Sequence, residues 1–107
     1  MQKNNTSAER IIEIVSMVTE VPICDIVSKS RKGPVVMARH LSMYMIRKQT
    51  SDRRYKEPGS IGNQEISSIF GRHYSTLLHS VKTIDNIRSY DKSIDGIIAL
   101  IEMELGK

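Results

Sequence analysis

The sequence is poor in large aromatic residues and has a single cysteine. Its 107 residues include one Phe, no Trp and four Tyr, and apolar residues make up 39% of the chain. With Cys24 alone, an intramolecular disulfide bond and a zinc site made only of thiolates are both excluded. A chain of this length forms one domain, and its core must be aliphatic, with the fifteen isoleucines supplying most of it.

The chain also lacks a long apolar run. Its longest such stretch, residues 94–105, is interrupted by four residues: Asp95, Gly96, Glu102 and Glu104. Residues 1–5 contain no apolar segment of the kind found in signal peptides. We therefore expect one soluble, cytoplasmic domain over residues 1–107, without a membrane partner and with a flexible N-terminus at residues 1–6.

Residue patterns typical of catalysis or cofactor binding are missing as well. Cys24, His40, His73 and His79 show neither CxxC nor HxxxH spacing, so we expect no metal site. Ser75 and His79 have no third acidic residue to orient them, so they do not predict a catalytic pair. The sequence contains no GxxxxGK[ST] phosphate-binding loop. It thus predicts a protein that is not an enzyme and has no cofactor and no small-molecule substrate.

Positive charge is concentrated in one block. The net charge is +4, but residues 28–56 contain nine Lys and Arg against Asp52 alone. Such a block is typical of a surface that binds a polyanion such as nucleic acid. A solvated face with a disordered basic loop is the alternative explanation of the charge taken by itself.

Apolar residues recur at helical spacing, and no segment alternates with a period of two, so we predict an all-α fold of about six helices. The expected helices cover approximately residues 7–19, 23–27, 35–49, 64–70, 75–90 and a segment that follows Asp91. Side-chain caps are expected at the starts of four of them, from Thr6, Asn63, Ser75 and Asp91. Gly71 supplies the positive φ that the exit of the fourth helix requires.

The spacing also predicts which side chains face inward. On the third helix these are Ala38, Leu41, Tyr44 and Met45, and on the fifth they are Leu78, Val81, Ile84 and Ile87. Met37, Met43 and Met45 are expected to pack in the core and at its rim. Residues 50–62 are charged and carry little to bury, so we expect a mobile basic loop whose Arg53, Arg54 and Lys56 add contacts to a nucleic-acid backbone.

A short helix, a tight glycine turn and a longer helix over residues 64–90 form the pattern of a helix-turn-helix. In such a motif the start of the second helix enters the major groove of DNA. Here that helix begins His73-Tyr74-Ser75-Thr76, with His79 one turn later. These side chains are short or planar hydrogen-bonding groups, which suits the reading of base edges, and the helix N-terminus suits a phosphate.

Two motifs, in this order, resemble the C-terminal DNA-binding domain (domain IV) of the bacterial replication initiator DnaA, whose fold is related to the Trp repressor. The first is Val27-Ser-Lys-Ser-Arg-Lys32 with the helix Ala38-Arg-His-Leu-Ser-Met-Tyr44. The second is Glu65-Ile-Ser-Ser-Ile-Phe-Gly-Arg72 with Ser75-Thr-Leu-Leu-His-Ser80. The resemblance covers about residues 7–89.

The resemblance implies a role in DNA binding for twelve residues. Arg31 matches an arginine that inserts into the minor groove, and Arg39 and His40 match a third-helix pair that meets the DNA. Ser75, Thr76 and His79 match polar residues that contact bases, thymine methyl groups and phosphates. The remaining expected DNA-binding residues are Lys29, Lys32, Arg72, His73, Tyr74 and Lys82.

The sequence departs from the family pattern in four respects. His73-Tyr74 replaces the usual Asp-His pair, so an acceptor suited to cytosine is lost. The glycine turn at Gly71 is shorter, and the loop after Thr50 is longer than usual. Tyr74 either fills the space left by the shorter turn or contacts DNA. Without the phosphate-binding loop, ATP hydrolysis and origin unwinding are not implied, and the DNA-binding end remains as a free-standing chain.

The hypothesis is therefore sequence-specific binding of double-stranded DNA at replication origins by a bacterial, nucleoid-associated protein without ATPase activity. One alternative is a transcription or copy-control regulator with an unrelated site. Another is a protein-interaction module that acts on the replication machinery.

Overall fold

The computed structural model describes residues 8–50 and 63–106, and this part of the chain is all-α, as predicted. Its six helices are α1 (Ala8–Thr19), α2 (Ile23–Ile26), α3 (Gly33–Thr50), α4 (Asn63–Ile69), α5 (Tyr74–Arg88) and α6 (Lys92–Leu105). None of these helices is long and apolar enough to span a membrane. The expected loop over residues 50–62 and the flexible segment 1–6 lie outside the described residues, apart from Thr50 at the end of α3.

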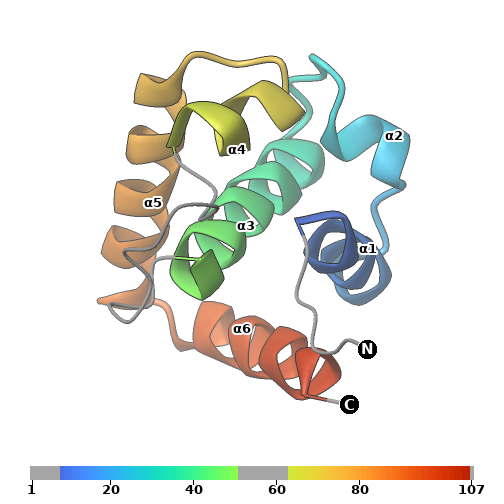
Figure 1. The fold of residues 1–107 in the computed structure, drawn as a ribbon. Helices are drawn as coiled ribbons and strands as arrows, with labels where there is room; N and C mark the ends of the chain where they lie inside the picture. The colour runs from blue at the N-terminus through green and yellow to red at the C-terminus, as the bar shows by residue number, and fades with distance from the viewer. Residues whose placement is uncertain (1–7, 51–62, 107) are drawn as a thin grey trace.

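Helix α3 is the centre of the fold. It packs against α1 and α2 on one side and against α4 and α5 on the other, while α6 packs on α1 and α5 (Figure 1). Its buried side chains include the four that the spacing predicts, Ala38, Leu41, Tyr44 and Met45, together with Arg39, Ser42, Met43 and Ile46. Since buried residues occur on every face, α3 has the pattern of a helix enclosed by other helices rather than of a surface helix.

The core is aliphatic and rich in isoleucine, as expected. Helix α1 buries Ile11, Ile12, Ile14 and Val15, and α6 buries Ile94, Ile98 and Ile101. The single Phe of the chain, Phe70, is also fully buried. Met43 and Met45 lie in the core and Met37 is half-buried, as predicted.

The α4–α5 turn confirms one expectation and corrects another. Gly71 has φ 64°, the left-handed conformation that glycine adopts without strain. The cap of α5, however, is His73 and not Ser75, because the helix begins one residue earlier than expected. His73 has extended backbone, and its Nδ1 accepts a hydrogen bond from the backbone N–H of Ser75 at 3.2 Å. An imidazole nitrogen thus takes the place of the usual hydroxyl or carboxylate oxygen.

The other expected caps have different outcomes. Asp91 caps α6, since its Oδ1 accepts from the backbone N–H of Ser93 at 3.0 Å, as predicted. Thr6 and the side chain of Asn63 lie outside the described residues.

The inward face of α5 differs from the prediction at one position. Leu77 is fully buried, whereas Leu78 is 45% exposed and was wrongly assigned to the core. Ile84 is buried and Val81 and Ile87 are half-buried, as expected. Leu77 and Leu78 lie four and three residues before Val81, and both separations suit a helix, so spacing alone does not choose between them.

Arg88 joins three helices at the end of the molecule that contains α6. Its Nη1 donates to the hydroxyl of Tyr44 on α3 at 2.7 Å, and its Nε donates to Oδ1 of Asp95 on α6 at 2.6 Å. Lys48 of α3 forms an ion pair with Glu102 of α6 at 3.5 Å. These contacts join α6 to α3 and α5 at this end of the molecule.

Candidate nucleic-acid interface

The basic loop, residues 28–32 between α2 and α3, has a defined shape that its two serines produce. Ser28 Oγ donates to the carbonyl of Asp25 at 2.6 Å and accepts from the N–H of Ser30 at 3.0 Å. Ser30 Oγ in turn accepts from the N–H of Lys32 at 3.3 Å. The serines are half-buried, whereas the expected DNA-binding residues of the loop, Lys29, Arg31 and Lys32, are all exposed. The backbone is therefore turned so that the cations face outward.

Arg39 has a place different from the one expected for a residue that meets DNA. Its side chain is buried, with only 5% exposed. Its Nε donates to the carbonyl of Ile26 at 2.8 Å, and its Nη2 donates to the carbonyls of Ser28 at 2.8 Å and Asp25 at 3.3 Å. Burial, followed by the charge of Arg72, lowers the pKa of Arg39. The guanidinium thus satisfies carbonyls at the end of α2 instead of lying on the surface.

Arg72, in the turn between α4 and α5, is half-buried and points toward the basic loop. Its Nη2 donates to the carbonyl of Ser28 at 3.2 Å. Its Nε is buried and has no hydrogen-bond partner among the described residues. Its backbone N–H donates to the carbonyl of Ser67, which closes the turn. Arg72 therefore connects the helix-turn-helix with the basic loop.

His40 lies at the interface between α3 and α5. Its Nδ1 is 2.7 Å from Oγ of the buried Ser80, and its ring meets the ring of His79 edge-on at a centroid distance of 6.2 Å. Burial is the main cause that lowers the pKa of His40, and the charges of His79, Arg39 and Arg72 add to it. This environment therefore favours the neutral form of the His40 imidazole.

The outer face of α5 carries the remaining expected residues. His73, Ser75, His79 and Lys82 are exposed, and Thr76 is half-buried. The side chain of Tyr74 lies outside the described residues, so neither interpretation of it is tested. Leu78 also lies on this face, between Ser75 and Lys82 at helical spacing, and the sequence-based prediction missed it. The outward orientation of Leu78 would follow from the sequence only if Leu77 were first assigned to the core.

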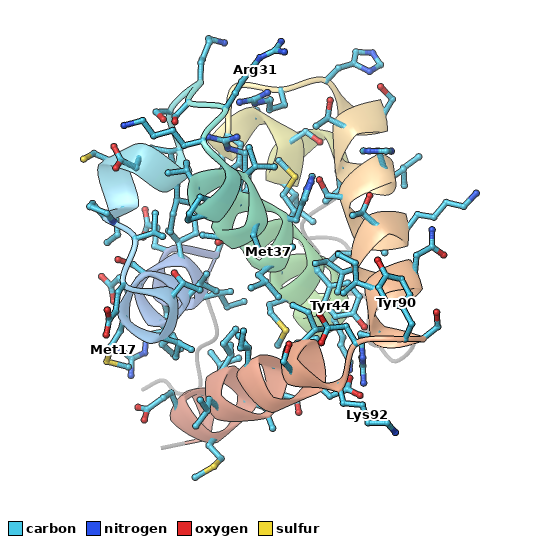
Figure 2. All side chains as sticks on the ribbon, turned by 180° about the vertical axis from the view of Figure 1, so that it is seen from behind. Met17, Arg31, Met37, Tyr44, Tyr90 and Lys92 are labelled. Carbon is cyan, nitrogen blue, oxygen red and sulfur yellow. The ribbon has the colours of Figure 1, made fainter. Side chains whose placement is uncertain are left out.

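The basic loop and the start of α5 lie at the same end of the molecule. Figure 1 shows the loop that enters α3 beside the connection between α4 and α5. Figure 2 shows Arg31 at this end, and Lys92 of α6 at the opposite end. The amides in the first turn of α5 add a partial positive charge there. The described residues bring no three His, Cys, Asp or Glu side chains together in a metal-binding arrangement.

The fold and this end of it define a helix-turn-helix domain with an adjoining basic loop. Residues 8–84 match the family described as the bacterial dnaA protein helix-turn-helix. The chain therefore belongs to the bacterial DnaA helix-turn-helix family, whose domains bind double-stranded DNA, and the resemblance noted in the sequence is confirmed.

Individual relatives agree with the family match. The chain is 31% identical over 103 residues to the chromosomal replication initiator protein DnaA of Flavobacterium psychrophilum, covering 96% of this chain and 20% of that protein. It is 32% identical over 107 residues to DnaA of Bacteroides thetaiotaomicron, covering 97% of this chain and 21% of the relative. The chain thus spans about a fifth of the length of the relatives it matches, and this fifth is the DNA-binding part.

Proposed function

We propose that this chain binds double-stranded DNA in a sequence-specific manner, at a site of the kind that DnaA recognises in replication origins, and that it catalyses no reaction. The observation that supports this most is that the basic loop, whose cations are exposed, lies at the end of the molecule where α5 begins (Figure 1). In the proposed complex α5 enters the major groove, and Arg31 enters the adjacent minor groove.

Each exposed side chain on this face has a role that its chemistry suits. Lys29, Lys32 and Lys82 contact phosphates, which fixes the position of the domain on the duplex. Ser75 and His79 contact base edges. Leu78 supplies an apolar surface for a thymine methyl group, and His40 holds α5, the proposed recognition helix, through Ser80.

His73 reads a base through its Nε2. The tautomer that fits the capping hydrogen bond, which Nδ1 accepts, carries its ring proton on Nε2. An N–H donor suits an acceptor such as N7 of guanine or adenine, whereas the Asp usual in this family suits the amino group of cytosine. The preferred base at this position is therefore expected to differ from that of family members with Asp.

The test compares two exposed cations at opposite ends of the molecule (Figure 2). Arg31→Ala and Lys92→Ala remove the same charge, and their affinities for a labelled duplex are measured by fluorescence anisotropy. We expect Arg31→Ala to weaken binding by about 1–3 kcal/mol and Lys92→Ala to change it by less than about 0.5 kcal/mol. Equal effects would show attraction by net charge alone and would contradict the proposed interface.

A further inference from the structure

The carbonyl of Ser28 is the meeting point of the basic loop, helix α3 and the helix-turn-helix. It accepts a hydrogen bond from Nη2 of Arg39 at 2.8 Å and another from Nη2 of Arg72 at 3.2 Å. These two arginines come from elements that are distant in sequence, 11 and 44 residues from Ser28. The first residue of the basic loop is therefore attached at once to the central helix and to the turn that leads into α5.

Two like charges on one acceptor are unfavourable unless other interactions compensate. Arg39 donates to two further carbonyls, of Ile26 and Asp25, and so covers the C-terminal end of α2 where carbonyls lack helical partners. A buried guanidinium is stabilised when its donors are used in this way. Arg72 keeps its Nε buried without a partner among the described residues, yet still bonds to the same carbonyl.

The attachment continues along the basic loop. The hydroxyl of Ser28 accepts from the N–H of Ser30, and the hydroxyl of Ser30 accepts from the N–H of Lys32. Arg31 lies between these last two residues and is exposed. A chain of hydrogen bonds thus leads from the turn at Arg72 to the backbone on both sides of Arg31.

We propose that Arg39 and Arg72 are positioning residues, which fix the basic loop relative to α5 so that Arg31 and the recognition helix engage adjacent grooves together. The inference rests on the proposed function. An arginine held in place before binding loses less conformational freedom in the complex, so its contact contributes more to affinity. In this account neither Arg39 nor Arg72 needs to touch the DNA, and each acts through Arg31.

A double-mutant cycle separates positioning from direct contact. Arg72→Met is made in the wild-type chain and in Arg31→Ala, and duplex affinity is measured for all four proteins. In the wild type we expect a loss of about tenfold, of the same order as the loss of Arg31 itself. In the Arg31→Ala background we expect less than about twofold further loss, because the side chain being positioned is gone.

Conservative variants provide a second readout. Arg72→Lys keeps the charge, so a phosphate contact by residue 72 would survive, while a bond that depends on the reach of Nη2 would be lost. Arg39→Lys keeps the buried charge but offers one nitrogen for three carbonyls. We expect both to resemble Arg72→Met. Arg88→Met is the matched control, since it removes an arginine from a hydrogen-bond network at the opposite end.

Minor-groove reading is measured directly with inosine. Replacing a G·C pair by I·C in the segment beside the α5 contact removes only the guanine amino group from the minor groove. We expect the wild type to prefer I·C, and Arg31→Ala, Arg72→Met and Arg39→Lys to lose this preference. We expect Arg88→Met to lower the melting temperature and to keep the I·C preference. If the role of Arg72 were purely structural, Arg72→Met would behave in the same way.

The outcomes distinguish the two proposals. If the losses from Arg31→Ala and Arg72→Met multiply, or if Arg72→Lys restores binding and the I·C preference, then Arg72 contacts DNA itself and the positioning role is wrong. If Arg31→Ala has no effect in the wild type, then the proposed function fails before the question of positioning arises.

Discussion

Two adjacent leucines of α5 have opposite surroundings, and this gives a sharp test of how the helix is oriented. Leu77 is fully buried in the core, whereas Leu78 is 45% exposed on the face that also carries Ser75 and Lys82. Leu77→Ala and Leu78→Ala delete the same atoms from neighbouring positions. The first substitution should therefore act on stability and the second on DNA binding.

The expected loss of stability for Leu77→Ala follows from its burial. Truncation of a buried leucine costs about 2–5 kcal/mol, which includes the cavity left behind. In a domain of this size each kcal/mol corresponds to roughly 4–8 °C, so the melting temperature should fall by about 8–40 °C. Since small domains have only about 5–15 kcal/mol of stability, this variant is expected to be marginally folded.

Leu78→Ala should leave stability nearly unchanged, within about 0.5 kcal/mol. If Leu78 contacts a thymine methyl group, duplex affinity should fall by about 1–2 kcal/mol, since each buried methylene contributes about 0.8 kcal/mol. A duplex with uracil in place of thymine lacks these methyl groups, so wild type and variant should bind it with more nearly equal affinity.

Circular dichroism melting and fluorescence anisotropy on the two variants give both quantities. The orientation of α5 would be refuted if Leu78→Ala caused the larger fall in melting temperature. Loss of affinity that is equal for the thymine and uracil duplexes would refute the methyl contact while leaving the orientation intact.

Three further substitutions test separate features. Gly71→Ala should cost about 1 kcal/mol from its positive φ alone, since a Cβ there would meet no atom within 4 Å, and a denaturant titration that finds no loss would contradict the turn geometry. His40 has a lowered pKa in the folded protein, so the unfolded chain binds more protons below about pH 6.5. The contribution of the neutral His40 to stability is therefore lost as the pH falls through that value. His40→Gln should therefore reduce the slope of melting temperature against pH between about pH 7 and 5.5, and an unchanged slope would count against this role. His73→Asp keeps a capping group but replaces a donor by an acceptor, so selection from a random duplex library should change the preferred base at one position from a purine to cytosine. An unchanged selected sequence would contradict base reading by His73.

Much of the fold follows from local sequence patterns. Helical spacing of the isoleucines, Asp91 as a cap and Gly71 as a turn residue are local features, and each is found as predicted. The orientation of α5 could not be predicted from the sequence, because Leu77 and Leu78 both fit the helical spacing. The cap by His73 depends on a ring nitrogen that capping preferences do not rank.

The candidate site was predicted only in part, because part of it depends on contacts between distant segments. That Lys29, Arg31 and Lys32 are exposed follows from their polar, charged surroundings. The burial of Arg39 depends on where the end of α2 packs against α3, and sequence spacing gives no sign of that contact. The link from Arg72 to Ser28 spans 44 residues and is likewise a product of the tertiary fold.

The most direct test of the central claim is fluorescence anisotropy with a duplex that carries the nine-base-pair box of the DnaA family and with a scrambled duplex, each at several salt concentrations. We expect tighter binding to the duplex with the box. We also expect a slope of log affinity against log salt of about −3, from the phosphate contacts proposed for Lys29, Lys32 and Lys82. Salt-sensitive binding without preference for the box would require a different DNA site. Affinity that is absent, or independent of salt, for both duplexes would contradict DNA binding and favour a module that binds protein.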